Sequence, residues 1–306
     1  MLQPDNLTEY IGQDKIKKSI KVSLNASKMR NEPFPHILLH GASGLGKTTL
    51  ANIIANEFDS SCHHFLAPVI ESHNIIYDAL LEIHEHEFMF IDEIHALPKK
   101  LQETLYTAMT DYTIDNPMGW GGRINLRPFT LIGATTDLGL LAPPFRERFG
   151  FIVQLTRYSY EEIKKIIYIN AHKMQLDISD TALDHLSLSS RRNPRTANRL
   201  LERCRDTATV SHTILINEPI VRTTLRNLDI DENGLTSNDF EILDTLIYKF
   251  DLNPVGLKAL SLQTNIDEKA IESIYEPHLI EMDLIERTPR GRVATTKGVE
   301  YFAKNN

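Results

Sequence analysis

The stretch Gly41-Ala42-Ser43-Gly44-Leu45-Gly46-Lys47-Thr48-Thr49 constrains the fold of this chain more than any other feature. It fits the pattern G-x-x-x-x-G-K-[ST] and lies between a predicted strand at 37–39 and a predicted helix at about 47–58. Glycines let backbone N–H groups approach phosphate oxygens, and a helix N-terminus adds a positive dipole end. A chance glycine-rich turn would not need both flanking elements. We therefore predict a nucleotide-binding loop in which ATP is held by Gly44, Gly46, Lys47, Thr48 and Thr49.

A second apolar run, 88–91, ends in Asp92-Glu93. Acids often follow buried strands, so this pair alone is weak. It lies about 45 residues after Lys47, however, which leaves room for a helix, a strand and another helix. We expect Lys47 to contact the β- and γ-phosphates, and Thr48 with Asp92 to hold Mg²⁺. Glu93 would orient and deprotonate the attacking water, which predicts ATP hydrolysis.

The order of apolar segments predicts the fold class. Further short runs at 129–134 and 151–155 alternate with helical segments, including one at 12–30, and this indicates a parallel α/β sheet covered on both faces. The candidate active groups follow strand ends, where such sheets bind ligands. The next part, 159–228, has the apolar spacing of helices and no convincing strand, which indicates a small all-α domain.

The C-terminal part predicts a winged helix. Residues 229–234 have the composition of a linker. Two helical stripes follow, and then two short strands around the turn Pro289-Arg290-Gly291. The predicted domains are an ATPase domain at 1–158, a helical lid at 159–230 and a winged helix at 231–306.

Three other positions are candidates for the ATPase site, each with a simpler alternative. Thr136 ends an apolar strand and could touch the γ-phosphate or its water, or be an ordinary strand end. Arg148 could reach a neighbouring subunit's ATP as an arginine finger, or belong to a surface ion-pair cluster. Arg195 begins a helix and could reach the γ-phosphate, or lie on a solvated basic face.

The hairpin carries the DNA prediction. Arg287, Arg290 and Arg292 surround its turn, and a basic wing would contact phosphates without reading sequence. The net charge of −8 and the pI near 5.8 argue against a protein that binds nucleic acid over its whole surface. Any DNA-binding surface is therefore expected to be local.

Composition indicates a cytoplasmic protein. The two cysteines, Cys62 and Cys204, lie far apart, which fits a reducing compartment. The N-terminus has no basic and apolar secretory pattern, and no apolar run is long enough for a membrane span. The histidine clusters 63–64 and 84–86 lack metal-ligand spacing, so Mg²⁺ is the only metal expected.

Taken together, these stretches closely resemble the RuvB family of AAA+ motors, which drive branch migration of Holliday junctions. The resemblance covers nearly the whole chain. Its most discriminating stretches are Pro254-Val255-Gly256-Leu257 and Arg287-Thr288-Pro289-Arg290-Gly291-Arg292-Val293-Ala294-Thr295, which generic AAA+ proteins lack. Other matches are Glu9–Gln13, Gly44–Glu57, Phe90–His95, Phe129–Thr136 and Pro194–Leu201.

The resemblance implies a homohexameric ring on duplex DNA that serves recombination and repair, a junction-binding RuvA-type partner and a RuvC-type resolvase. It makes Thr136 the first sensor, Arg195 the second sensor and Arg148 the finger that acts in trans. It makes Arg287 and Arg292 DNA contacts. It also places these residues at the nucleotide of the same or a neighbouring subunit: Leu2, Tyr10, Ile11, Tyr158, Thr110, Asp111 and Tyr112.

The sequence departs from the family pattern at several points. Ala42-Ser43 replaces the usual pair of prolines, Thr110 replaces a usual acid, and 115–128 is a few residues shorter than usual. In the family that last segment forms the hairpin that docks RuvA. Ile124 and Leu126 remain candidates for an apolar contact there.

Two other functions stay open from the sequence. One is another AAA+ activity, such as a clamp loader subunit or a protein remodeller, but a clamp loader would normally carry a helical collar in place of the basic hairpin. The other is a nucleotide-gated binding module. Such a switch would need neither Glu93 nor Arg148.

Overall fold

The structure is a computed structural model that describes residues 3–116 and 122–305, so Leu2 lies outside the described residues. The chain divides into two compact units, Met1–Tyr158 and Ser159–Asn306. The first unit contains the phosphate-binding loop, and the second contains the helical lid and the winged helix.

Five parallel strands form the main sheet of the first unit. The two strands next to β1, the strand before the loop, are β6 and β7, and β3 lies on the far side of β6. In spatial order the strands are β2 (Cys62–Leu66), β3 (Phe88–Asp92), β6 (Thr130–Thr135), β1 (Ile37–His40) and β7 (Phe151–Gln154). The central strands are buried along almost their whole length, as expected when both faces of a parallel sheet are covered. The predicted strands are confirmed.

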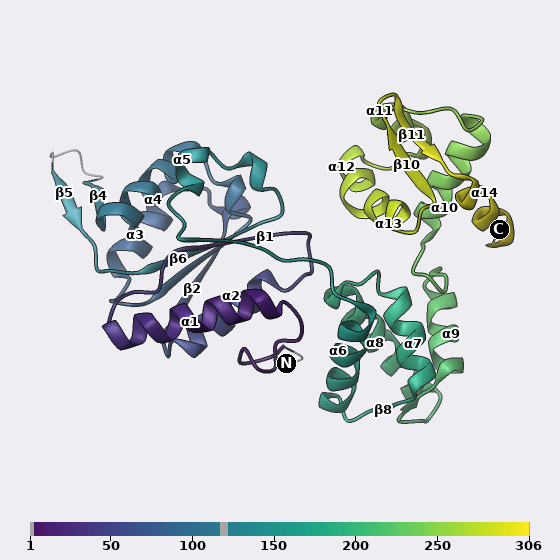
Figure 1. Ribbon diagram of the computed structural model, residues 1–306, viewed down its shortest axis with the longest axis horizontal. Coiled ribbons are helices and arrows are strands. Elements are labelled where there is room, and N and C mark those ends of the chain that lie inside the picture. Colours follow the sequence, from purple (N-terminus) through teal and green to yellow (C-terminus); the bar gives the residue numbers. More distant parts are fainter. Residues whose placement is uncertain (1–2, 117–121, 306) are drawn as a thin grey trace. The chain divides into compact units, whose positions relative to one another are not determined.

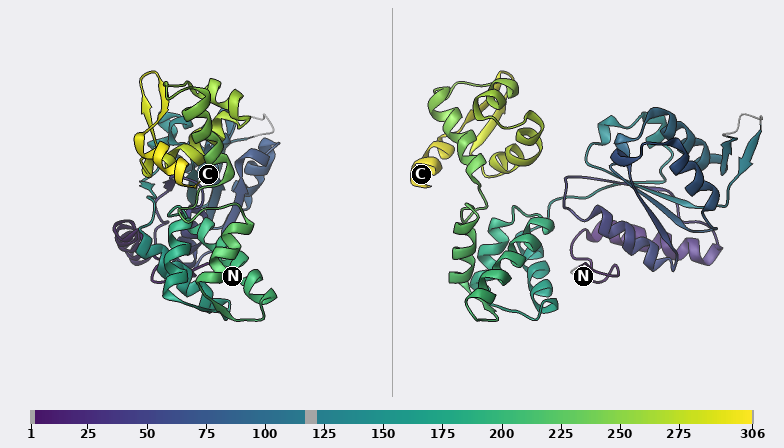
Figure 2. Two further views of the ribbon diagram at one scale, coloured as in Figure 1. Left: turned by 90° about the vertical axis from the view of Figure 1, so that its right-hand side faces the viewer. Right: turned by 180° about the vertical axis from the view of Figure 1, so that it is seen from behind.

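Helices cover both faces of this sheet (Figure 1). On one face, α1 (Asp14–Arg30) lies beside α2 (Lys47–Glu57), which begins directly after the loop (Figures 1 and 2). On the other face, α3 (His73–Glu82), α4 (Lys99–Asp111) and the short α5 (Pro143–Arg146) share one apolar core with β3 and β6. A small hairpin, β4 (Thr113–Asp115) and β5 (Arg123–Asn125), extends from the end of α4.

The lid is built from four helices and one very short strand pair among the described residues. The helices are α6 (Tyr160–Lys173), α7 (Asp180–Ser189), α8 (Pro194–Val210) and α9 (Glu218–Asn227). The strands β8 (Asp177–Ile178) and β9 (Leu215–Ile216) pair in parallel, so the expectation of no strand was wrong by this one pair. Two-residue strands leave too little alternation in the sequence to predict them.

The winged helix follows as α10 (Ser237–Asp244), a π-helical turn η4 (Thr245–Lys249), α11 (Leu257–Thr264) and α12 (Glu268–Ala270). A second π-helical turn, η5 (Ile271–Tyr275), continues into α13 (Glu276–Glu281). The wing is β10 (Ile285–Thr288) and β11 (Gly291–Ala294), and α14 (Thr296–Asn305) ends the element order. The hairpin expected around Pro289 is confirmed.

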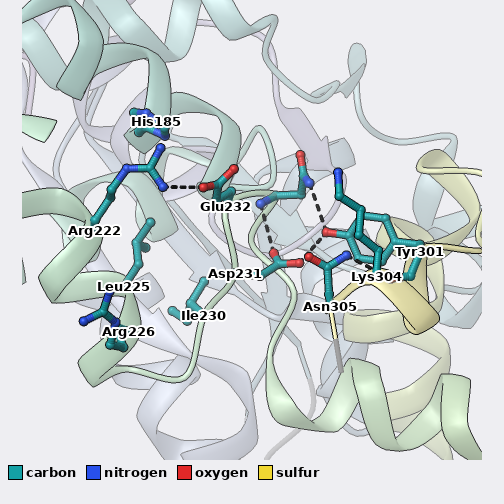
Figure 3. Close-up of a pocket in the computed structure, with 11 residues that line it drawn as sticks. His185, Arg222, Leu225, Arg226, Ile230, Asp231, Glu232, Tyr301, Lys304 and Asn305 are labelled. Atoms are coloured by element: carbon teal, nitrogen blue, oxygen red, sulfur yellow. Dashed lines mark hydrogen bonds and ion pairs between the residues drawn. The ribbon is translucent and has the colours of Figure 1, made fainter. Parts of the chain in front are cut away.

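The segment 229–234 contacts both the lid and α14, which its interpretation as a linker did not predict. The Asp231 carboxylate accepts backbone N–H bonds from Asn233 at 2.9 Å and Leu235 at 2.7 Å. Gly234 has φ +84°, and a Cβ there would lie 2.5 Å from the Ser189 carbonyl oxygen of the lid. Figure 3 shows Asp231 pointing toward Tyr301 of α14. The Asp231 carboxylate therefore bonds to the backbone of this turn, although the composition of the segment is that of a loop.

Candidate nucleotide site

The phosphate-binding loop has the backbone that its glycines predict. Gly44 and Gly46 have φ values of 82° and 94°, in the left-handed region that side chains rarely adopt. A Cβ on Gly46 would also lie 2.8 Å from the Tyr10 hydroxyl oxygen. Helix α2 begins at the next residue, Lys47, so its free N–H groups face the loop. This geometry is suited to binding the phosphates of a nucleotide.

Lys47 is held close against the loop that precedes it. Its residue is only 7% exposed, and its Nζ donates to the carbonyls of Gly41 at 2.7 Å and Ala42 at 3.1 Å. The same charge and partial burial lower the pKa of His40 at the end of β1, with burial the larger cause. His40 is thereby favoured in its neutral form, which leaves the positive charge of the loop on Lys47.

Thr48 and Asp92 form an oxygen pair at the carboxyl edge of the sheet. The Thr48 hydroxyl donates to Asp92 Oδ2 at 3.3 Å. A hydroxyl beside a carboxylate is the hard oxygen donor set that Mg²⁺ takes when phosphates and water complete its shell. Across the described residues, no cluster of three or more His, Cys, Asp or Glu side chains could hold a metal. The pair fits Mg²⁺ bound together with a nucleotide, and it is too small for an all-protein metal site.

Glu93 lies next to Asp92 and bonds to the end of β6. Its Oε2 accepts from the Thr136 hydroxyl at 2.9 Å and from the Thr136 N–H at 3.3 Å. Glu93 has φ 49°, which is uncommon for a residue with a side chain and directs the carboxylate back to the sheet edge. The two residues proposed from separate strand ends therefore meet. Thr135, by contrast, is fully buried inside β6.

Two tyrosine side chains contact the backbone of the phosphate-binding loop. The Tyr158 hydroxyl donates to the carbonyl of Leu45 at 3.2 Å and lies 3.2 Å from the Tyr10 hydroxyl. Tyr10 in turn lies 3.4 Å from the same carbonyl, and burial raises its pKa well above the usual value. Both side chains are almost fully buried, while Ile11 is half-buried. The resemblance placed these tyrosines at the nucleotide, and the structure adds their contact with the loop backbone.

The end of α4 carries the three residues expected to face a neighbouring subunit. Thr110 is exposed, and its hydroxyl donates to the Tyr106 carbonyl at 2.8 Å. Asp111 lies 3.6 Å from Arg123 of the β4–β5 hairpin. Tyr112 instead packs inward, with its ring 6.0 Å from that of Phe129. Thr110 and Asp111 are therefore the surface members of this group.

Arg148 follows α5 and packs against α4. Its guanidinium lies over the ring of Tyr106, 4.3 Å from the centroid, and donates to the Tyr106 hydroxyl. No sequence pattern points to Tyr106, because a single aromatic on an amphipathic helix is ordinary core composition. The arginine is exposed and stands on the surface, not in the core.

Arg195 lies in the first turn of α8, in the second unit. Asn193 caps this helix, accepting from the N–H groups of Arg195 at 3.0 Å and Thr196 at 3.3 Å, and Pro194 occupies the first position. The Asn-Pro-Arg stretch therefore fixes where the helix begins. The Arg195 side chain is exposed there.

The three wing arginines are not equivalent in the contacts that they make. Arg287 and Arg292 both pair with Glu276, whose side chain is 1% exposed, and Arg287 also donates to Glu272 at 2.9 Å. Arg290 sits in the turn itself and is exposed, without an ion pair among the described residues. The charge most available to a phosphate is therefore that of Arg290.

The structure corrects one of the two candidates for an apolar contact with RuvA. Leu126 is only 9% exposed and belongs to the core with β3 and β6, so it is not a surface contact. Ile124 is half-buried on β5. Leu126 follows a strand, and its residue type alone does not show whether such a position lies in the core or on the surface.

Together the fold and the site define a P-loop ATPase of the AAA+ class, with a helical lid and a winged helix in the same chain. Three family models match it: the "Holliday junction DNA helicase RuvB P-loop domain" at residues 2–155, the "RuvB AAA lid domain" at 158–231 and the "RuvB C-terminal winged helix domain" at 232–303. The chain belongs to the RuvB family.

Individual relatives agree with the family models. The "Holliday junction branch migration complex subunit RuvB" of Pseudothermotoga lettingae is 43% identical over 305 residues, covering 98% of this chain and 88% of the relative. The protein of the same name from Acholeplasma laidlawii is 42% identical and covers 99% and 93%. The solved structure of the Thermotoga maritima RuvB Holliday junction branch migration motor matches with a TM-score of 0.89 at 40% identity, covering 99% of this chain and 98% of that one. These matches confirm the resemblance found in the sequence.

Proposed function

We propose that this protein is an ATP-dependent DNA motor that drives branch migration of Holliday junctions in recombination and DNA repair. The single observation that carries the proposal is the meeting of two pairs, Thr48 with Asp92 and Glu93 with Thr136, at one sheet edge beside the phosphate-binding loop. The names of the relatives, subunits of a Holliday junction branch migration complex, supply the DNA substrate.

The chemistry is hydrolysis of ATP to ADP and phosphate. The loop N–H groups and Lys47 bind the phosphates. Thr48 and Asp92 would hold Mg²⁺, and the ion would supply positive charge beside the phosphate oxygens. Glu93 takes a proton from water as the water oxygen bonds to the γ-phosphorus and the bond to the leaving ADP oxygen breaks. Thr136, the first sensor, holds Glu93 in place.

The remaining roles require a ring. Arg148 acts in trans on a neighbouring protomer's γ-phosphate, and Arg195 acts as the second sensor from the lid. Residues 110–112 lie near a neighbouring subunit's nucleotide. Tyr10 and Ile11 line the adenine site, as the resemblance also implies for Leu2, and Tyr158 lies near the nucleotide. The exposure of Arg148 and Thr110 supports this assignment. The proposed assembly is a homohexamer around duplex DNA.

DNA is bound by the wing, with Arg290 contacting phosphate most directly and Arg287 and Arg292 held beside it. The proposed partners are a RuvA-type junction-binding protein, for which the resemblance implies docking at 115–128, and a RuvC-type resolvase. The proposed domains are 1–158, 159–230 and 231–306, and the proposed location is the cytoplasm. Among the residues that the structure describes, every helix is too short or too polar to cross a bilayer.

The experiment is an ATPase assay of the whole protein alone, with linear duplex, and with a four-way junction plus a RuvA-type protein. We expect hydrolysis that DNA stimulates and junction strand exchange that needs ATP. The Glu93→Gln variant should bind ATP and not turn it over. Absence of ATP consumption under all three conditions would overturn the proposal, and hydrolysis without strand exchange would favour a remodeller or loader.

A further inference from the structure

His95 lies three residues beyond Asp92, in the single 3₁₀ turn η2 (Ile94–Ala96) that follows β3. Its side chain is 13% exposed. Its Nδ1 lies 2.8 Å from the Thr135 hydroxyl oxygen and 3.3 Å from Glu93 Oε2. The ring therefore stands between the proposed general base and the strand that carries the first sensor.

The hydrogen bonds around Thr135 assign the proton on this ring. The Thr135 hydroxyl donates to the Asp137 carbonyl at 3.0 Å, and the Asp137 N–H donates back to the hydroxyl oxygen at 3.0 Å. A hydroxyl has one hydrogen, and the carbonyl can only accept. The hydroxyl therefore accepts from His95, so Nδ1 carries a hydrogen. The same nitrogen lies 3.3 Å from Glu93 Oε2.

Both sets of contacts converge on one oxygen of Glu93. Oε2 accepts from the hydroxyl and the N–H of Thr136 and faces Nδ1 of His95. Among the described residues, the other oxygen, Oε1, has no hydrogen-bond partner. Fixing one carboxylate oxygen orients the second, and the second is the one that can accept a proton from water.

We propose that His95 is a positioning residue for hydrolysis: its Nδ1–H donates to the Thr135 hydroxyl, and this bond holds the ring nitrogen 3.3 Å from Glu93 Oε2, so that Oε1 is directed at the attacking water. The inference rests on the proposed ATPase function. Among the described residues, the hydrogen bond and the ion pair of His95 go to Thr135 and Glu93, not to the phosphate-binding loop. The residue should therefore influence the chemical step and leave nucleotide affinity unchanged.

The test compares three substitutions of His95 in the whole protein. His95→Asn keeps an N–H donor close to the position of Nδ1, His95→Gln moves the donor one methylene further out, and His95→Ala removes it. We expect His95→Ala to lower kcat about 10- to 100-fold, the scale of a misplaced catalytic group. KM for ATP should stay within about twofold, because the lost interaction acts in the transition state. His95→Asn should recover most of kcat, and His95→Gln should not.

The matched control is His63→Ala. His63 pairs with Glu87 at 3.0 Å, at the start of β2 and therefore at the opposite edge of the sheet. Its loss should leave kcat unchanged. Thermal unfolding of every variant separates loss of fold from loss of positioning, and His95→Asn keeps the test open if His95→Ala unfolds.

Two failures are distinguishable. If the wild type consumes no ATP with DNA and partner, the proposed function fails. If the wild type is active and Glu93→Gln is dead, but His95→Ala retains full kcat, only the role of His95 fails. A His95→Asn variant that is folded and as slow as His95→Ala also overturns the inference, because a merely packed ring would then explain the loss.

Discussion

The Arg148 guanidinium lies over the Tyr106 ring, 4.3 Å from its centroid, and the two side chains are also joined by a hydrogen bond to the phenol. This pair connects the segment after α5 to α4 across one surface of the first unit. The ring limits the directions in which the guanidinium can point. The pair should therefore influence the direction in which Arg148, the proposed arginine finger, points toward a neighbouring protomer.

Replacing Tyr106 should separate the ring from the hydroxyl. Tyr106→Phe keeps the cation–π contact and should leave kcat nearly unchanged. Tyr106→Leu removes it, and because such contacts contribute about 0.5–1 kcal/mol at exposed sites, kcat should fall about two- to fivefold. Steady-state ATPase at saturating ATP and DNA measures both. Equal loss in the two variants would point to the hydroxyl in place of the ring.

If Arg148 acts in trans, as proposed, inactive subunits should complement each other. Arg148→Ala should lose about 10³-fold or more in hydrolysis, and Lys47→Ala should be inactive because it cannot bind phosphate. A mixture should regain activity, since an intact finger on a Lys47→Ala protomer can serve an intact site on an Arg148→Ala protomer. The ATPase rate against mixing ratio measures this.

The control for that experiment is a mixture of Lys47→Ala with Glu93→Gln. Neither protomer then has a complete site, so no ratio should restore activity. If the Arg148→Ala mixture behaves like this control, the finger does not act between subunits.

The wing predicts different outcomes for its arginines. Arg290→Ala should weaken duplex binding and reduce the salt dependence of log K by about 1, as for one lost phosphate contact, without changing thermal stability. Arg292→Ala should instead destabilise the winged helix by about 3 kcal/mol, because it leaves the buried Glu276 carboxylate with only half-exposed Arg287. DNA titrations at several salt concentrations and thermal unfolding compare the two. Identical behaviour of both variants would contradict this division.

How much the sequence predicts depends on the range of the interaction. The loop, the Asp92-Glu93 pair and the β10–β11 hairpin follow from local patterns, because glycine conformation, strand burial and turn chemistry act over a few residues. The contacts that shape the site are long-range. Tyr106 with Arg148, and His95 with Thr135, are separated by about 40 residues. No local pattern encodes such pairs, and a resemblance identifies a role without showing what holds the residue in place.

The contact between the lid and the winged helix predicts a variant in which DNA binding and ATP hydrolysis are less strongly coupled. Arg191 donates to Asp239, whose side chain is fully buried, and to the Gly234 carbonyl at 2.7 Å. Arg195 lies four residues further along the chain, so one short segment carries both this contact with the winged helix and the proposed second sensor. Arg191→Ala should lower DNA stimulation of the ATPase severalfold and keep the basal rate within about twofold, because it loosens the contact between the lid and α10 of the winged helix and removes no residue of the proposed nucleotide site.

Arg192→Ala is the matched control, since its Glu281 partner is more exposed than Asp239 and exposed pairs contribute little. ATPase rates over a duplex titration give both quantities. If basal and stimulated rates fall together in Arg191→Ala, the pair supports the lid itself and does not couple it to DNA.

His36 predicts how stability depends on pH. Its Nδ1 accepts the Leu131 N–H at 2.8 Å, so Nε2 carries the hydrogen and lies 3.2 Å from the Met109 carbonyl. A second proton would face the Leu131 N–H in a buried site, and burial lowers the His36 pKa to about 4. Between about pH 6.5 and 4 the unfolded chain therefore binds more protons than the folded protein. The free energy of unfolding should fall as pH drops through this window, by about 2 kcal/mol at pH 5.

His36→Gln removes the titration and keeps one donor and one acceptor. The variant should be less stable than the wild type at pH 7.5, and the difference should shrink by about 2 kcal/mol at pH 5, because the other histidines titrate alike in both proteins. Urea unfolding at pH 7.5, 6.5 and 5 measures the difference directly. Parallel stability curves would mean that His36 takes up its proton without cost in the folded state, and that the two hydrogen bonds at its ring do not fix its protonation.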